Sequence, residues 1–333
     1  MAFLILSYLS HMVRIGLYGI GHLGKIHLKI LKGLPQLFEV VGFYDINHDS
    51  AAAVAQEFNV PYFSNPDKLL DSVDAIDVVT PTPYHFDIAA KAMNRNKHVF
   101  IEKPVTQTLA ESSSLMELLK QSTSVVQVGH VERFNPAFVA AQPLLKNPDF
   151  IETHRLAQFN PRGTDVPVVL DLMIHDLDII LHVVKSPVKH ISASGVAVVS
   201  DSHDITNARI EFENGAVANL TASRISLKNM RKSRFFQRDA YVGIDFLNKS
   251  IEVVRLESIV GLVDPYDMVL DLGNGKAPKK LSIDSPKIYP TNAIEEELKE
   301  FAAAILENKA ISVDLKAGHD ALTVAYKILE LIK

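Results

Sequence analysis

Cysteine is absent from the sequence. Disulfide bridges, thiolate metal sites and a cysteine nucleophile are therefore excluded, because each requires a sulfur that the chain does not contain. An excess of positive charge is also missing, since 34 Lys and Arg residues face 39 Asp and Glu residues, which gives a net charge of −5. No global basic field attracts nucleic acid or anionic lipid, so neither is expected as a partner.

Long hydrophobic runs are missing as well. No segment approaches the roughly 18 uninterrupted apolar residues that a membrane-spanning helix requires. The apolar run at residues 2–6 lacks a basic lead and is too short for the hydrophobic core of a signal peptide. We interpret residues 1–12 as an N-terminal extension, or as a start assigned too early ahead of Met12. We expect a soluble, cytoplasmic protein without a membrane span.

The remaining sequence is typical of a globular protein with two domains. Its 333 residues exceed the usual size of one domain, and 47% of them are hydrophobic. From residue 13 to residue 131, short apolar runs alternate with amphipathic stretches, which predicts an α/β domain with a doubly wound parallel sheet. The expected strands are 13–18, 38–44, 75–79, 98–101 and 125–128, and the expected helices are 22–34, 49–58, 85–95 and 109–121.

From residue 132 to residue 333 the pattern is that of an α+β domain. A helix predicted at 170–184 is followed by strand-like runs with hairpin signals such as Asn214-Gly215. The expected strands are 191–199, 207–213, 216–223, 240–246 and 251–256. Residues 261–290 are predicted to form a long loop or irregular strands. The last two predicted helices are 292–307 and 315–332, and the final one is compatible with packing against the first domain.

A glycine-rich turn marks the predicted nucleotide site. Six residues follow the first predicted strand and open a helix: Gly19, Ile20, Gly21, His22, Leu23 and Gly24. The first glycine permits a tight turn, the second lets the backbone approach a pyrophosphate, and the third allows close helix–strand packing. The N-terminus of the helix then faces the phosphates. This pattern alone is a weak signal, and the alternative is a glycine turn that binds nothing.

Asp45 strengthens the prediction of a nucleotide site. It ends the second predicted strand, 21 residues after Gly24, where dinucleotide-binding domains place the acid that binds the ribose diol. The carboxylate would repel the 2′-phosphate of NADP, and no arginine follows it. The predicted cofactor is therefore NAD, and the alternative is a solvated aspartate.

A lysine follows the strand predicted at 98–101, in the run Glu102-Lys103-Pro104. Ligands of an open parallel sheet bind at the carboxyl ends of the strands, so Lys103 is expected where nicotinamide and substrate meet. Pro104 restricts the backbone of Lys103 and is compatible with a cis peptide bond. The alternative is a solvated surface lysine.

The helix predicted at 170–184 carries one polar stripe on an otherwise apolar surface. At about 100° per residue, its members are Asp171, His175, Asp178 and His182. A helix that is apolar nearly all round should be buried, so the stripe must face partners, water or a ligand. Asp176 lies off the stripe. The alternative to a reaction site is a structural network of Asp and His side chains that bridges the domains.

Together these motifs resemble the Gfo/Idh/MocA family of oxidoreductases, the relatives of glucose-fructose oxidoreductase and inositol dehydrogenase. The resemblance covers nearly the whole chain, from Val13 to the last helix. Its motifs are the glycine turn at 19–24, the Thr-Pro-Thr-Pro-Tyr-His run at 80–85, Glu102-Lys103-Pro104, the run at 129–136, and the Asp-x-x-x-His-x-x-Asp pattern of Asp171, His175 and Asp178.

The resemblance implies an N-terminal Rossmann domain and a C-terminal domain with an open, mainly antiparallel sheet that often serves as an oligomer interface. It implies that Lys103, Asp171 and His175 form the catalytic set. Cofactor contacts are expected from Thr80, Pro81, His85, Glu102 and Lys103, in addition to the glycine turn and Asp45. A homodimer or homotetramer is the expected assembly.

Within the family, the runs at 130–136 and 222–237 are similar to those of UDP-N-acetylglucosamine 3-dehydrogenases. This similarity implies oxidation of the 3-hydroxyl of a UDP-N-acetylhexosamine. The substrate-binding residues are then expected to be Glu132, Arg133, Asn135 and Arg224, together with Lys103, Asp171 and His175. One departure is that residues 165–169 and Met173 replace glycines found in many family members, so the substrate pocket is expected to differ from that of free-sugar dehydrogenases.

The segment 224–238 is basic within an acidic protein. Its cations are Arg224, Lys228, Arg231, Lys232, Arg234 and Arg238. Arginine forks suit phosphate oxygens, so part of this segment is expected to hold the UDP moiety, either within one chain or from a neighbouring subunit. The alternative is a solvated basic hairpin.

The expected reaction is oxidation of a secondary alcohol by NAD, or its reverse. His175 would take the hydroxyl proton, because its pKa lies near neutrality, while Asp171 orients the imidazole or binds the substrate. Lys103 would stabilise the developing alkoxide. No metal is expected, since no convincing ligand cluster stands in the sequence. The alternatives are a dehydrogenase or reductase of a free sugar, polyol, bile pigment, imine or dihydrodiol, and a non-catalytic NAD-binding regulator.

Overall fold

The computed structural model describes residues 12–160, 166–260 and 267–332, and the structural statements below refer to these. The chain divides into two units, one made of Met1–Val131 and Asn292–Leu322, the other of Glu132–Thr291 and Thr323–Lys333. The range predicted for the second domain, 132–333, thus includes a segment that groups with the first unit. The predicted N-terminal extension lies outside the described residues except for Met12, as does Asp165 of the glycine-replacing run. Within the described ranges, no helix has both the length and the apolarity needed to cross a membrane.

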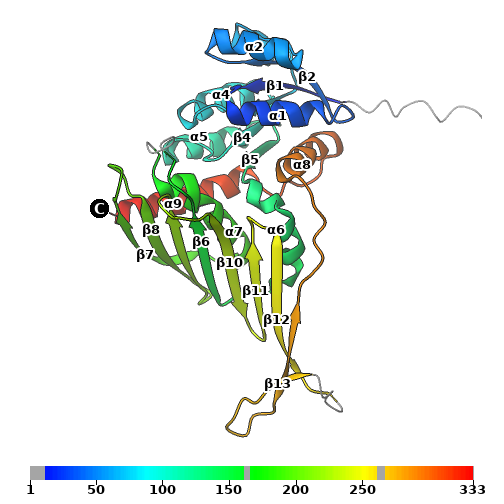
Figure 1. The fold of residues 1–333 in the computed structure, drawn as a ribbon. Helices are drawn as coiled ribbons and strands as arrows, with labels where there is room; N and C mark the ends of the chain where they lie inside the picture. Colours follow the sequence, from blue (N-terminus) through cyan, green and yellow to red (C-terminus); the bar gives the residue numbers. More distant parts are fainter. Residues whose placement is uncertain (1–11, 161–165, 261–266, 333) are drawn as a thin grey trace, which may run out of the picture. The chain divides into compact units, whose positions relative to one another are not determined.

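The first unit is built on a five-stranded parallel sheet with the order β2-β1-β3-β4-β5 (Figure 1). The strands are β1 Val13–Tyr18, β2 Phe38–Tyr44, β3 Ala75–Val78, β4 His98–Glu102 and β5 Val126–Gly129. They confirm the predicted Rossmann sheet with shifts of one residue at some ends. The chain reverses its winding between β1 and β3, and a crevice opens at the carboxyl ends of the strands at such a point.

Helices α2, α3, α5 and α8 of this unit begin at polar side chains that cap them. The Asn47 side chain caps α2, Thr108 and Glu111 form a capping box at α5, and Asn292 caps α8. The helices are α1 His22–Lys32, α2 His48–Phe58, α3 Pro66–Asp71, α4 His85–Met93, α5 Leu109–Leu119 and α8 Ala293–Glu307. Leu298 and Phe301 of α8 join the apolar core around β1, which explains why this late segment belongs to the first unit.

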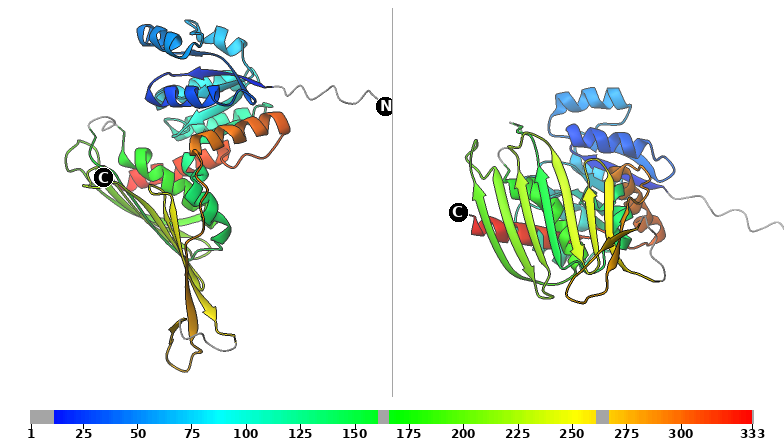
Figure 2. Two further views of the ribbon diagram at one scale, coloured as in Figure 1. Left: turned by 45° about the vertical axis from the view of Figure 1, so that its right-hand side comes forward. Right: turned by 60° about the horizontal axis from the view of Figure 1, so that its bottom comes forward.

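The second unit is built on a nine-stranded sheet with the order β13-β14-β12-β11-β10-β6-β9-β8-β7 (Figure 2). All neighbours are antiparallel except β6 and β9. The strands are β6 Phe150–Leu156, β7 Val188–Val196, β8 Ile205–Phe212, β9 Val217–Ser223, β10 Met230–Gln237, β11 Ala240–Asp245, β12 Ser250–Ser258, β13 Met268–Leu270 and β14 Lys279–Asp284. The open, mainly antiparallel sheet that the family resemblance implied is confirmed.

Helices α6 Pro136–Ala141 and α7 Ile174–Val184 cover one face of this sheet, and their apolar side chains share its core. The last helix, α9 Leu315–Leu331, runs from the first unit's residues into those of the second, and its residues Val324, Ala325 and Ile328 belong to the same core. The right-hand view of Figure 2 shows the opposite face of the strands turned toward the reader. An antiparallel sheet with one solvated face alternates buried and exposed side chains along each strand.

Four strands of this sheet were not predicted, and two of them form its centre. Strand β10 has the sequence Met-Arg-Lys-Ser-Arg-Phe-Phe-Gln, in which Ser233 and Phe235 are buried while Lys232 and Arg234 are exposed. Its alternation was hidden because basic side chains fill exposed positions and only one apolar residue, Phe235, is buried. The other unpredicted strands are β6, β13 and β14; the last two lie in the segment expected to be loop or irregular strand.

Replacing Phe235 by alanine should lower the free energy of unfolding of the second unit by about 3–5 kcal/mol, the usual result of emptying an aromatic position in a core. Phe235 is fully buried, whereas its neighbour Phe236 lies on the opposite face and is 36% exposed. Phe236→Ala should therefore cost clearly less. Denaturant unfolding of both variants, followed by circular dichroism, measures the difference, and equal losses would contradict these faces of β10.

Candidate functional site

The glycine turn between β1 and α1 needs its first and third glycines for the fold itself. Gly19 has φ +93, a left-handed conformation that side chains disfavour, and a Cβ there would lie 2.7 Å from the Val79 carbonyl oxygen. A Cβ on Gly24 would lie 2.3 Å from the Gly19 carbonyl oxygen. Gly21 differs, because nothing lies within 4 Å of its ideal Cβ position. The open space at Gly21, at the N-terminus of α1, is where a phosphate can approach the backbone.

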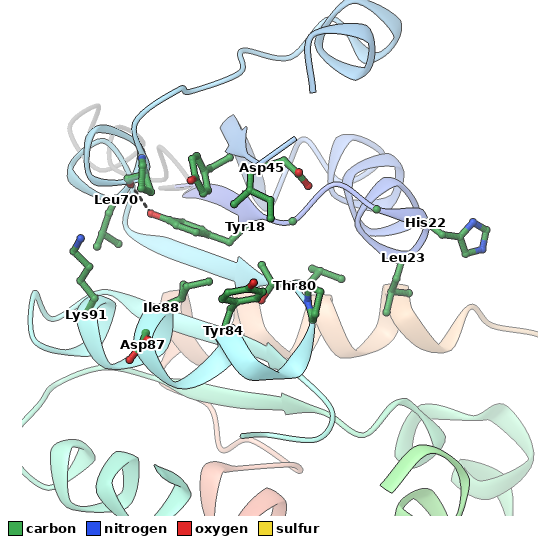
Figure 3. A pocket seen from close by; sticks show the side chains of 17 residues that line it. Tyr18, His22, Leu23, Asp45, Leu70, Thr80, Tyr84, Asp87, Ile88 and Lys91 are labelled. Atoms are coloured by element: carbon green, nitrogen blue, oxygen red, sulfur yellow. Dashed lines mark hydrogen bonds between the residues drawn. The ribbon is translucent and has the colours of Figure 1, made fainter. Parts of the chain in front are cut away.

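A pocket of about 720 Å³ opens at this turn (Figure 3). Of the predicted cofactor residues, its wall contains Gly19, Gly21, His22, Leu23, Asp45, Thr80 and Pro81. Tyr18, Tyr44, Tyr84 and Ile88 add aromatic and apolar surface that sequence reasoning did not single out. The size and mainly apolar wall suit a nucleotide held by a few polar groups.

Asp45 stands at the end of β2 with its carboxylate already oriented by the backbone. Its Oδ2 accepts the Ile20 N–H at 2.8 Å, and its Oδ1 accepts the Asn47 N–H at 2.8 Å. These two bonds tie the glycine turn to the end of β2. A carboxylate has further lone pairs, so the side chain can still accept bonds from ribose hydroxyls in the pocket.

His85, predicted to contact the cofactor, is buried among carbonyl groups of the chain itself. Its Nδ1 lies 2.9 Å from the Pro104 oxygen and its Nε2 lies 2.9 Å from the Thr80 oxygen. Burial lowers the pKa of this imidazole, while the two carbonyls oppose the shift. His85 therefore links the Thr80 loop to the segment after β4, and a direct contact with the cofactor remains a prediction.

Lys103 follows β4 at the carboxyl end of the sheet, and the Lys103–Pro104 peptide bond is cis. The side chain of Lys103 is partly buried, and its backbone N–H donates to Glu102 Oε2 at 3.1 Å. Glu102, also predicted as a cofactor residue, is only 8% exposed and points into the domain core. Neither residue belongs to the wall of the nucleotide pocket, so their predicted roles remain predictions.

A cluster of buried titratable side chains, His27, Asp77, Glu102 and Glu297, lies beneath the end of β4. His27 Nδ1 is 2.9 Å from Asp77 Oδ2, and His27 Nε2 is 3.3 Å from Glu102 Oε1. Ligand-type atoms of His27, Glu102 and Glu297 lie within 4.8 Å of one another. No such group was expected, because its members come from α1, β3, β4 and α8. An Asp inside the apolar strand β3 was the one available signal.

The helix of the second unit begins differently from the prediction. Residues Val169–Met173 form a π-helical turn, and the α-helix proper starts at Ile174. A π turn has a different number of residues per turn from an α-helix, so the 100° spacing that placed Asp171 on the stripe does not apply there. Such turns often occur at functional sites. Asp171 and His175 are both partly buried at this junction.

The other acidic residues of this helix are paired with buried arginines. Asp178 receives Arg133 through Nε at 2.6 Å and Nη2 at 2.7 Å. Asp176, unexplained by the sequence, receives Arg155 of β6 at 2.9–3.2 Å. Arg155 also donates to Glu132 Oε1 at 2.9 Å. Burial disfavours the charged form of Arg155, but the carboxylates of Asp176 and Glu132 favour it more strongly. The pKa of Arg155 is therefore raised.

Several residues that were predicted to bind the substrate lie within or next to these buried ion pairs. Glu132, Arg133 and Asn135 are buried, at 6–8% exposure, within this network. The Asn135 side chain donates to Glu132 Oε2 at 2.9 Å and to the Phe246 carbonyl at 3.0 Å, and its own oxygen caps α6. Their substrate contacts remain predictions, and the contacts present in the structure stabilise the unit itself.

His182, the last member of the predicted stripe, is separate from Asp171 and His175. Its Nε2 lies 2.8 Å from Gln142 Nε2. Burial and the nearby Arg133 guanidinium lower the pKa of His182 to about 4. The side chain is therefore neutral at physiological pH. The predicted stripe runs from Asp171 and His175, which are partly buried at the start of the helix, to Asp178, which is paired with Arg133, and His182.

The cations of the basic segment 224–238 also have different surroundings. Arg224 is buried, and its Nη2 donates to the Val166 carbonyl. Arg231 is half-exposed and approaches Glu132 Oε1 at 3.7 Å, on the side of β10 that faces the helices. Lys232 and Arg234 lie on the opposite face, where they pair with Asp245 and Glu152. The segment is therefore a strand of alternating faces rather than one uniform cationic patch.

Comparisons with known proteins agree with this geometry. Residues 13–130 match the "Oxidoreductase family, NAD-binding Rossmann fold", and residues 149–237 match the GFO/IDH/MocA C-terminal domain. A UDP-N-acetylglucosamine 3-dehydrogenase of Acidithiobacillus ferrooxidans is 34% identical over 95% of this chain and 96% of its own length. The chain belongs to the GFO/IDH/MocA oxidoreductase family.

Further relatives show the same fold and chemistry class. The solved structure of the Acidithiobacillus ferrooxidans enzyme covers 97% of this chain and 98% of its own, with a TM-score of 0.86 and 32% identity. A scyllo-inositol 2-dehydrogenase (NAD(+)) of Bacillus subtilis is 30% identical over 66% of this chain and 69% of its own length. The protein is an NAD-dependent dehydrogenase of this family.

The residues present fit the cofactor of the family. The space above Gly21, the N-terminus of α1 and the oriented Asp45 carboxylate provide a place for a pyrophosphate and a ribose diol. When bound, NAD supplies the hydride acceptor. The protein supplies the pocket and the polar groups that fix its orientation.

Alanine at the two α1 glycines should separate folding from cofactor binding. Gly24→Ala should lower the melting temperature, because its Cβ would collide with the Gly19 carbonyl. Gly21→Ala should leave the melting temperature nearly unchanged, because its Cβ meets open space, yet weaken NADH binding by occupying the space of the pyrophosphate. Thermal unfolding and NADH fluorescence titration measure both effects. Unchanged NADH affinity in Gly21→Ala would rule out this phosphate site.

Proposed function

We propose that this enzyme oxidises the 3-hydroxyl of a UDP-linked N-acetylhexosamine with NAD. The observation that carries the proposal is similarity along both units, over 95% of the chain, to an enzyme named for that reaction. Half-exposed Arg231, beside the buried network of the second unit, supports it, because a guanidinium can bind the oxygens of a pyrophosphate. A free sugar would not need such a cation.

His175 is the proposed general base. Asp176 and Asp178 are already held by arginines, so they are poorly suited to move a proton. Asp171 and His175 lie at the π–α junction, partly buried, and an imidazole can accept a proton near neutral pH. Asp171 is proposed to orient the imidazole or to bind the substrate.

Lys103 is the proposed electrophilic group in the first unit. Its position at the carboxyl end of β4 is where the ligands of an open parallel sheet bind. Its ammonium group would stabilise negative charge that develops on the substrate oxygen as the proton leaves. Glu132, Arg133, Asn135 and Arg224 are proposed to shape the substrate side mainly by holding the second unit in place.

A free polyol or sugar is the second candidate substrate. The 30% identical relative of Bacillus subtilis is named for oxidation of scyllo-inositol, which carries no nucleotide. We further propose that the enzyme works in the cytoplasm as a homodimer or homotetramer. Exposed apolar residues on the outer strands, among them Met268 at 53% and Ile283 at 53%, support self-association.

His175→Ala should lower kcat by roughly 10²–10⁴-fold, the usual contribution of a general acid–base group, while NADH affinity stays nearly intact. The matched control is His182→Ala on the same helix, because His182 is neutral and bonded to Gln142. It should retain most of the turnover. Steady-state kinetics and NADH titration test both variants, and wild-type turnover by His175→Ala would exclude this residue as the base.

UDP should inhibit competitively against the sugar substrate. Arg231→Gln should raise KM for the UDP-sugar by roughly 10–150-fold with little change in KM for NAD, since one charge-assisted bond is worth about 1.5–3 kcal/mol. Arg238→Gln is the control, because that side chain is 95% exposed and pairs only loosely with Asp239. If UDP fails to bind or inhibit at millimolar concentration, the nucleotide sugar is excluded and a panel of free sugars and polyols identifies the second candidate.

A further inference from the structure

We infer that His27 is a positioning residue for Lys103, acting through the Glu102 carboxylate. The inference rests on the proposed role of Lys103 and extends it to a residue outside the substrate and cofactor sites. It starts from the cluster of His27, Asp77, Glu102 and Glu297, whose exposed fractions are 0%, 0%, 8% and 0%. Buried ionised groups are strongly unfavourable without partners, so this arrangement requires an explanation beyond packing.

A chain of hydrogen bonds and one ion pair leads from the core to the lysine. Asp77 Oδ2 lies 2.9 Å from His27 Nδ1 in a hydrogen bond, and His27 Nε2 lies 3.3 Å from Glu102 Oε1, at ion-pair distance but without hydrogen-bond geometry. The other carboxylate oxygen, Glu102 Oε2, accepts the backbone N–H of Lys103 at 3.1 Å. Each link fixes the next, so removing His27 would release the Glu102 side chain and with it the first peptide unit of Lys103.

His27 can hold Glu102 because it is flanked by carboxylates on both sides. A carboxylate close to each ring nitrogen favours the imidazolium form, in which both nitrogens carry an N–H. Burial alone would lower the pKa of His27, but Asp77 and Glu102 raise it well above the usual value. In return, the His27 charge lowers the pKa of Glu102 despite its burial. Glu102 is thereby kept as a carboxylate that can accept the Lys103 N–H.

The segment is held on its other side as well. His85 Nδ1 lies 2.9 Å from the carbonyl oxygen of Pro104, the residue after Lys103. The peptide unit before Lys103 and the one after Pro104 are thus each linked to a buried histidine, through Glu102 on one side and directly on the other. With the backbone of Lys103 fixed, only the rotamers of its side chain remain to vary. A fixed backbone helps to keep the ammonium group in the position that stabilisation of the substrate oxygen requires.

Glu297 accompanies the chain without forming a link in it. Both of its carboxyl oxygens are buried, and neither has a hydrogen-bond partner among the described residues. Burial, with the charges of Glu102, Asp77 and Glu300, raises the pKa of Glu297 well above its usual value, and His27 only partly opposes this. Glu297 therefore holds its proton more tightly than an exposed glutamate, which weakens its competition with Glu102 for the His27 charge.

Three members of the same cluster carry atoms of the kind that bind metal ions. The group of His27, Glu102 and Glu297 offers three ligands, whereas closed structural zinc sites take four. Glu102 also uses one oxygen for Lys103, and Asp77 is hydrogen-bonded to Nδ1 of His27, while Nε2 lies at ion-pair distance from Glu102. A protonated His27 cannot bind a metal, so the geometry favours protons over a cation.

A double-mutant cycle between His27 and Lys103 tests the inference. His27→Gln should lower kcat by roughly 10–100-fold, as misplacement of a catalytic group does, while NADH affinity is retained. In a Lys103→Ala background the same change should have little further effect, because the group that it positions is gone. Equal losses in both backgrounds would show a merely structural role and overturn the inference.

Glu102→Gln supplies a second cycle in case His27→Gln does not fold. It preserves the shape of the side chain but removes the charge that His27 holds, so it should show the same lack of additivity with Lys103→Ala. Both cycles are measured with whichever secondary alcohol the wild-type enzyme oxidises. Failure to oxidise UDP-sugars would therefore remove the proposed substrate without touching this inference.

Glu297→Gln distinguishes protons from a metal. A neutral amide resembles a neutral carboxylic acid, so this variant should keep kcat, melting temperature and the pH profile of kcat close to those of wild type. Elemental analysis of the purified wild-type enzyme should find no stoichiometric metal, and NMR of labelled histidines should show His27 as imidazolium at neutral pH. A metal bound at one per chain, or a His27 that is neutral at neutral pH, would overturn the inference.

Discussion

Neutralising buried charge is the constraint on which the arrangement of both units depends. An ionised side chain loses its hydration when it is buried, and removal of one partner from a buried pair costs about 3–5 kcal/mol. In the first unit, the His27 imidazolium lies between Asp77 and Glu102. In the second, the Arg155 guanidinium lies between Asp176 and Glu132. Each cation joins elements that are distant in sequence, so each pair also fixes how those elements pack.

Two aspartates of the second unit's long helix are fixed in buried ion pairs with arginines. The segment from the π turn to the end of α7, Val169–Val184, carries three aspartates and two histidines, a large polar content for a helix with a mostly apolar surface. Arginines hold Asp176 and Asp178. His182 is kept neutral by burial. Asp171 and His175, at the irregular start of the helix, are the residues we propose for proton transfer, and the rigid pairs one turn further on hold the helix that carries them.

The nucleotide site follows a different physical rule, in which backbone geometry matters more than charge. Gly19 and Gly24 are required by the turn itself, whereas the space above Gly21 serves the ligand. Asp45 belongs to both functions, since its carboxylate ties the turn to β2 while lying in the pocket wall. The same carboxylate therefore holds the glycine turn in place and forms part of the wall of the nucleotide pocket. Replacement of Asp45 is therefore expected to change the shape of the turn as well as the predicted preference for NAD.

The sequence by itself determined the features that depend on neighbouring residues. The glycine turn, the position of Asp45 and the alternation of strands and helices up to residue 131 follow from local rules, and their motifs were sufficient to identify the family. Asn214-Gly215 likewise marked the turn between β8 and β9, where Gly215 has a positive φ of 89. These signals are readable because each concerns a few consecutive residues.

Tertiary structure alone decided the features that depend on distant partners. Strand β10 is recognisable only beside β6, since its solvated positions carry basic residues. The π turn at Val169–Met173 changed the face on which Asp171 lies. Glu297, 195 residues beyond Glu102 in the chain, joins the buried cluster only because α8 returns to the first unit. The physical reason is that burial and charge pairing are properties of the folded chain, and no local pattern encodes which distant side chain will neutralise a buried one.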